Sequence, residues 1–125
     1  MKSETTPPTE QAIALVLPII DLLVARKYDE VAMLSRGRLK ASCLREEAES
    51  YPGTFVSDAS ESAKSIRIDP VCDGEWLVDM YLCSVEDGRT QLALRCVLEG
   101  SGAEFVALPW DLLVPYRFIS QTSAI

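Results

Sequence analysis

One predicted β-hairpin, running from Trp76 to Leu98, constrains the fold of this chain more than any other stretch. Apolar residues occupy every second position on both of its strands. These positions are Trp76, Val78, Met80 and Leu82, then Leu92, Leu94, Cys96 and Leu98. Alternation with a period of two predicts strands that bury one face. The two apolar rows share that face in only one pairing of the strands.

The length of the loop decides the pairing, because a slip of one residue exchanges the faces of a strand. A two-residue Asp87-Gly88 turn is a common hairpin signal, but it would separate the apolar rows. A three-residue loop, Glu86-Asp87-Gly88, joins them and sets Asp79 opposite Arg95. Each buried large apolar side chain contributes about 1.5–3 kcal/mol, whereas an exposed ion pair contributes at most about 1 kcal/mol. We therefore expect the three-residue loop, with Gly88 in the left-handed region.

Helical spacing dominates the chain before the hairpin. Apolar residues predict a helix from Thr9 to about Arg26 with Pro18 inside it, a second over Tyr28–Leu34, and a third over Ser42–Ser50 capped by Ser42. Residues 54–64 are polar and predict a loop.

Short strand signals flank the hairpin. Residues 66–69 predict a strand that Pro70 interrupts, and residues 103–108 predict a fourth strand, with Phe105 inward, that Pro109 breaks. The predicted fold is α+β, with N-terminal helices packed on one face of a four-stranded antiparallel meander. We expect residues 9–118 to form this single domain, residues 1–8 a disordered tail, and residues 119–125 a frayed C-terminal tail.

Charge and composition narrow the function classes. The chain has 125 residues, a net charge of −7 and no histidine, with a pI of about 4.5. The acidity argues against a nucleic-acid partner and fits either simple solubility or a basic protein partner. Without histidine the commonest general base and metal ligand are missing. We expect no catalytic site, no metal and no cofactor.

The cysteines and the N-terminal residues indicate the cellular compartment in which the protein is expected to reside. Four cysteines without C-x-x-C spacing predict reduced thiols, and we expect Cys83 to be the one near solvent. The first ten residues are polar and do not read as a signal peptide. The apolar run over residues 12–25 is too short to span a bilayer. We expect a cytoplasmic protein with no membrane partner.

The face of the hairpin turned away from the helices is the candidate interaction surface. It carries Leu77, Tyr81 and Val97 beside Asp79 and Arg95, and an apolar patch rimmed by charge is typical of a binding site. The alternative is that the C-terminal segment, from Trp110 to Phe118, folds back over it. The charged tip is either a contact loop or an ordinary turn. The candidate partner-binding residues are Asp79, Tyr81, Glu86, Asp87, Arg89, Arg95 and Trp110.

The hairpin also resembles a small bacterial domain family of unknown function. In that family helices lead into a tryptophan-containing strand, a Glu-acidic-Gly-Arg-Ser/Thr turn and a Leu-x-Leu strand. The matching positions here are Trp76, Glu86, Asp87, Gly88, Arg89, Thr90, Leu92 and Leu94. The likeness extends upstream to Tyr28-Asp29 and to residues 44–51, and so covers much of residues 10–114. In size and acidity the chain is also similar to immunity proteins that neutralise secreted toxins.

These observations lead to a functional hypothesis with two alternatives. We expect a non-enzymatic protein-binding module, most concretely an immunity protein for a cognate, basic bacterial toxin. The first alternative is a small-ligand-binding or enzyme scaffold, which requires a pocket with convergent polar groups between helix and sheet. The second is a homodimer joined through the outer sheet face.

Overall fold

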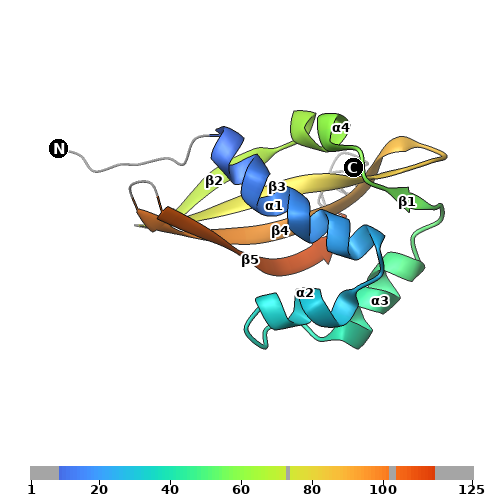
Figure 1. Cartoon of the computed structure of the whole chain (residues 1–125), viewed down its shortest axis with the longest axis horizontal. Coiled ribbons are helices and arrows are strands. Elements are labelled where there is room, and N and C mark those ends of the chain that lie inside the picture. Colours follow the sequence, from blue (N-terminus) through green and yellow to red (C-terminus); the bar gives the residue numbers. More distant parts are fainter. Residues whose placement is uncertain (1–8, 73, 102–103, 115–125) are drawn as a thin grey trace, which may run out of the picture.

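The protein folds into helices packed on one face of a curled antiparallel sheet (Figure 1). The computed structural model describes residues 9–72, 74–101 and 104–114. The helices are α1 (Thr9–Val24), α2 (Tyr28–Leu34), α3 (Ala41–Glu49) and α4 (Ala59–Lys64). The strands are β1 (Phe55–Val56), β2 (Arg67–Cys72), β3 (Glu75–Ser84), β4 (Gly88–Ser101) and β5 (Glu104–Leu113). The predicted α+β class is confirmed.

The sheet is the predicted meander with one strand added. Strands β2, β3, β4 and β5 pair in sequence order, each antiparallel to the next. The two-residue strand β1 pairs with the end of β3, on the same edge that β2 occupies further along. Strand β3 is therefore covered on that edge by two separate segments.

The central pairing of β3 and β4 is the one that the apolar rows require. Trp76 lies opposite Leu98, Asp79 opposite Arg95, and Met80 opposite Leu94. The buried side chains of these rows join those of α1 in a single core. In Figure 1 α1 lies across the sheet, while α2 and α3 lie beside β5. Phe105 belongs to the same core, so its predicted inward direction is correct.

The hairpin tip differs from the prediction by a bulge. The register shifts between Tyr81 and Cys83, so that Ser84 lies opposite Gly88 and the three loop residues are 85–87. Gly88 has φ +69 and begins β4. The bulge leaves backbone groups unpaired by the ladder, and side chains satisfy them. The Thr90 hydroxyl donates to the Leu82 carbonyl (2.9 Å) and accepts from the Leu92 N–H (3.1 Å).

Residues 54–64, predicted as a loop, hold β1 and α4 instead. Asp58 caps α4, because its side chain accepts a hydrogen bond from the Glu61 N–H. An acidic cap followed three residues later by glutamate is a helix-start signal, and it is present in the sequence. The prediction failed because the segment is short and poor in apolar residues, so no periodicity marks it.

Helix α4 also closes the gap between β1 and β2 on the edge of β3. Its Ser62 hydroxyl donates to the Tyr81 carbonyl at 2.8 Å, and the Tyr81 N–H donates to the Ser65 hydroxyl at 3.1 Å. Two serine side chains therefore replace one residue of a neighbouring strand. A buried, unpaired backbone pair would otherwise destabilise the sheet there.

Proline does not stop the strands where it was expected to. Strand β2 continues through Pro70 to Cys72 with an irregular register, and β5 continues through Pro109 to Leu113 with a bulge opposite Arg95 and Cys96. Apart from β1, β2 and β5 are the outermost strands, where a missing N–H is tolerated. The irregularities absorb the lost ladder bonds.

Two smaller expectations change, and one open alternative is decided for Leu112. Lys40, without a side-chain cap, precedes α3, so Ser42 is not its cap. Cys83 is buried, whereas Cys43 and Cys72 are the exposed thiols, because Cys83 lies beside Ser62 of α4. Leu112 packs in the core on the helix side, so this part of the C-terminal segment does not fold over the outer face. The tails predicted at residues 1–8 and 119–125, and Phe118, lie outside the described residues.

Candidate functional site

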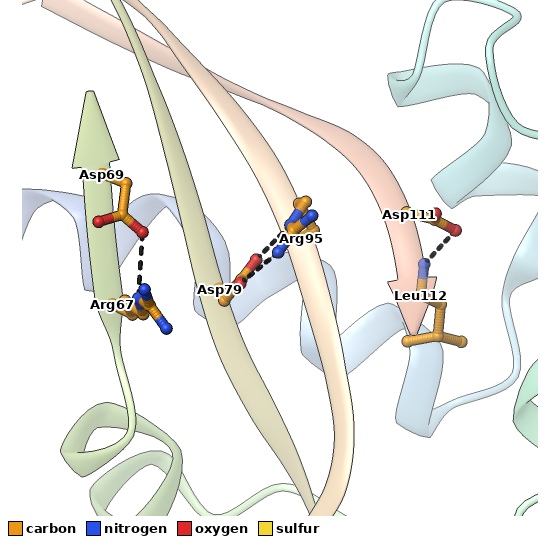
Figure 2. Close-up of polar contacts among 6 residues, drawn as sticks. All are labelled: Arg67, Asp69, Asp79, Arg95, Asp111 and Leu112. Carbon is orange, nitrogen blue, oxygen red and sulfur yellow. Dashed lines mark hydrogen bonds and ion pairs between the residues drawn. The ribbon is translucent and has the colours of Figure 1, made fainter. Parts of the chain in front are cut away.

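Charged residues of alternating sign form one row across the outer face of the sheet. Arg67 lies opposite Asp79, Asp79 opposite Arg95, and Arg95 opposite Asp111, on β2, β3, β4 and β5 in turn. Figure 2 shows this row. Arg67 bonds to Asp69 on its own strand (3.1 Å), and Asp111 accepts from the Leu112 N–H (2.8 Å). Only the central pair of the row is joined directly.

That central pair is a two-point ion pair at the middle of the sheet. The Arg95 Nε and Nη2 atoms each lie 2.8 Å from an Asp79 carboxylate oxygen. Asp79 is 8% exposed. The hydrogen bonds that Arg95 donates to Asp79 raise the pKa of Arg95 above its ordinary value, against the lowering effect of burial. The geometry is that of a bidentate arginine–carboxylate pair. The two charges neutralise each other within the sheet, so neither is free to bind a partner.

The predicted hairpin-tip residues are arranged around local contacts. The Arg89 guanidinium lies 5.2 Å from the ring centre of Tyr81, which is 7% exposed. The Glu86 carboxylate accepts the Thr54 N–H at 2.8 Å, and this bond lowers the pKa of Glu86 below its usual value. The Asp87 N–H donates to Ser84. Glu86, Asp87 and Arg89 are exposed, whereas Tyr81 offers little surface.

Trp110 lies elsewhere on the sheet, on β5. Its indole is 38% exposed, and the Arg38 guanidinium lies 3.6 Å from the ring centre. Arg38 also donates to the Trp110 carbonyl at 3.2 Å. Arg38 comes from the loop between α2 and α3, so the helical layer holds this exposed aromatic ring against the sheet. Such stacking of a cation on an aromatic ring is favourable.

Trp110 forms one wall of a groove of about 220 Å³ on the outer face. The other apolar walls are Val71, Leu77 and Val97, and two carboxylates complete the lining, Glu75 and Glu99. These two glutamates lie directly opposite each other on β3 and β4. Like charges in opposed positions destabilise a sheet. The Arg36 guanidinium lies 3.9 Å from the Glu99 carboxylate, and both side chains are largely exposed. An exposed ion pair of this kind is weak, so it offsets little of the repulsion between Glu75 and Glu99.

The structure therefore divides the seven predicted residues into separate groups. Asp79 is joined to Arg95, and Tyr81 to Arg89. Glu86 and Asp87 bond locally at the hairpin tip, and Trp110 belongs to the groove. Sequence reasoning missed Glu75 and Glu99. The signal was available, because extending the Trp76–Leu98 pairing by one residue sets these two glutamates opposite each other on the outer face. Val71 could not be placed, because the strand was expected to end at Pro70.

The part of the chain that the structure describes has neither a metal-type cluster nor a membrane-spanning helix. No cluster of three or more histidine, cysteine, aspartate or glutamate side chains there has the arrangement of a metal site. Within the same residues, no helix has the length and apolar character needed to cross a membrane.

The comparisons with known proteins place the chain in a family without indicating an activity. No curated protein and no solved structure shows significant similarity to it. A family model, described as a domain of unknown function, matches residues 20–115. This range contains the core hairpin and every residue of the groove. The chain belongs to this family, DUF7668.

Proposed function

We propose that this protein is a non-enzymatic protein-binding module that holds a basic side chain of a partner in the groove on its outer sheet face. The observation that carries the proposal is the opposed pair Glu75 and Glu99 beside Trp110. Two facing carboxylates favour the arrival of a cation, because it removes their mutual repulsion.

The shape and lining of the groove suit a lysine or arginine side chain. Val71, Leu77 and Val97 can pack along its aliphatic stem, while the charged head reaches the two glutamates. An exposed tryptophan is a frequent anchor at such interfaces. The net charge of −7 would speed the encounter with a basic protein.

Peptide titration tests this proposal. The probe is an acetylated and amidated leucine- and glycine-containing peptide with one central lysine, and its partner peptide has glutamine there. Binding is followed by tryptophan fluorescence, to which Trp110 is the exposed contributor. We expect the lysine peptide to bind. The double variant Glu75→Gln, Glu99→Gln should bind it about tenfold or more weakly, because it loses hydrogen bonds to a charged group.

The matched control is Glu47→Gln. Glu47 is exposed on α3, so this variant changes charge without touching the groove and should bind as the unchanged protein does. Equal binding of the lysine and glutamine peptides would contradict the proposal. So would equal binding by the double variant.

The more specific proposal is that the partner is a bacterial toxin and this chain its immunity protein. Co-expression with a toxin encoded in the neighbouring gene should protect cells, and the Glu75→Gln, Glu99→Gln double variant should not. Protection by Glu47→Gln serves as the control. If the unchanged chain fails to protect, the immunity role is wrong, while the peptide titration still decides whether the groove binds basic side chains.

A further inference from the structure

A second hollow lies away from the outer face, where the end of α1 meets α2, α3 and β1. It is a pocket of about 300 Å³, at the lower end of the range for small-molecule sites. Leu23 and Val24 supply aliphatic lining, and Tyr28, Tyr51 and Phe55 supply aromatic rings. The rings of Tyr51 and Phe55 lie 6.0 Å apart, tilted by 30°. Aromatic and aliphatic side chains therefore form part of a lining whose exposed surface is more polar than apolar.

Two exposed side chains of opposite charge line this pocket. Arg26 and Glu49 both line it, and neither makes an ion pair or hydrogen bond through its side chain with any other described residue. Both act on the Tyr28 hydroxyl. Burial raises the pKa of that phenol, Glu49 raises it further, and Arg26 lowers it. An arginine, a glutamate and a tyrosine therefore line the same cavity.

The backbone at Arg26 adds a separate observation. Arg26 has φ +63 and ends α1 in a Schellman motif, with the Lys27 N–H bonded to the Leu22 carbonyl and the Arg26 N–H to the Leu23 carbonyl. Glycine is the usual residue at this position, since a side chain in the left-handed region costs about 1–2 kcal/mol. Arginine at this position therefore carries a conformational cost that glycine would not.

We propose that this pocket binds a free aromatic α-amino acid. Its carboxylate pairs with Arg26, its ammonium with Glu49, and its ring packs among the aromatic and aliphatic side chains. A simple anion would meet Glu49, and a simple cation would meet Arg26. A ligand with both charges satisfies the two residues at once. This inference is independent of the outer groove.

Calorimetric titration with three probes tests the inference. L-Phenylalanine carries both charges, phenylethylamine lacks the carboxylate, and phenylpropionate lacks the ammonium. We expect the amino acid to bind, and each of the other two to bind about tenfold or more weakly, because each loses a charged hydrogen bond. No binding of phenylalanine would overturn the proposal, and so would equal binding of either singly charged probe.

The Arg26→Gly variant separates binding from folding. Glycine adopts the left-handed conformation freely, so the thermal unfolding midpoint should stay the same or rise while phenylalanine binding is lost. A matched control is Arg36→Gly, because Arg36 has φ +58 and does not line the pocket. Arg36→Gly should bind phenylalanine unchanged.

The outcomes of these variants are decisive. A lowered unfolding midpoint in Arg26→Gly would show that arginine serves the fold and would contradict the proposal. Full binding by Glu49→Gln would contradict the role of the carboxylate.

Discussion

At the scale of single residues, side-chain hydroxyls complete the backbone where the hairpin departs from a regular ladder. Thr90 bonds to both Leu82 and Leu92 across the bulge, and the Tyr51 hydroxyl accepts the Gln91 N–H at 3.0 Å. The Tyr51 bond ties the hairpin to the segment that follows α3. The bulge is thereby a satisfied feature of the sheet, which is the usual condition for one to persist.

Replacing Thr90 by valine should destabilise the protein by about 1–3 kcal/mol, because it leaves the Leu82 carbonyl and the Leu92 N–H buried without a partner. The shape of the side chain is kept, so the loss reports the hydroxyl. Urea unfolding measures the change. Thr90→Ser retains the hydroxyl and should lose clearly less; equal losses in the two variants would show that the methyl group matters instead.

Glu86 should titrate below its usual pKa of 4.5, because its carboxylate accepts the Thr54 N–H. Because the pKa of Glu86 is lower in the folded state than in the unfolded state, ionised Glu86 stabilises the fold. This stabilisation is fully present at pH values above the unfolded-state pKa, and it is lost as the pH falls through the folded-state pKa. The Thr54 amide shift, followed by NMR from neutral pH downwards, should move with a midpoint below 4.5. Glu86→Gln should abolish that movement. A midpoint above the usual value would refute the assignment.

At the scale of elements, contacts between neighbouring strands determine which side chains of the outer sheet face remain available to a partner. Arg95 of β4 binds Asp79 of β3, while α4 closes the far edge of β3 through Ser62 and Ser65. Part of the predicted interaction surface is therefore engaged in contacts within the protein itself. What remains open is the groove between β2 and β5, beyond the ion pair.

The Asp79–Arg95 pair should show a coupling energy of about 1–3 kcal/mol. This lies between the values for exposed pairs and for buried ones, because Asp79 is buried and Arg95 half-buried. A double-mutant cycle with Asp79→Asn and Arg95→Gln, measured by urea unfolding, gives the value. Additive losses within a few tenths of a kcal/mol would mean that the pair contributes nothing to stability.

At the scale of the whole molecule, the two hollows use separate parts of the chain. The groove is built from β2, β3, β4 and β5, and the pocket from the helices with β1 and the residues around it. They share no lining residue. The same small domain therefore has room for a protein partner on the outer face and for a small ligand at the helical end.

Changes at one hollow should leave the other unaffected, because well-separated sites that share no partners behave additively. Arg26→Gly should bind the lysine peptide as tightly as the unchanged protein, and the Glu75→Gln, Glu99→Gln double variant should bind phenylalanine unchanged. Titration of each variant with both probes checks this. Cross-effects of tenfold would indicate that the two sites are coupled through the sheet.

The sequence by itself determined the central hairpin and its covered face. The apolar rows that contain Trp76 and Leu98 bury enough area to impose one register on the two strands. That register places Asp79 opposite Arg95. Helices α1 and α2 were also readable, because their apolar spacing is local information. Burial of a whole row outweighs any single turn preference, so the register was predictable even though the tip was not.

Only the tertiary structure decided which residues of the outer face remain available. Cys83 and Tyr81 became buried, because α4 forms where no periodicity predicts a helix and because neighbouring side chains cover them. Strands β2 and β5 pass through Pro70 and Pro109, since their place at the sheet's margin tolerates a missing donor. The groove and the pocket each gather residues from several elements distant in sequence. Their assembly depends on packing between elements, which no local pattern encodes.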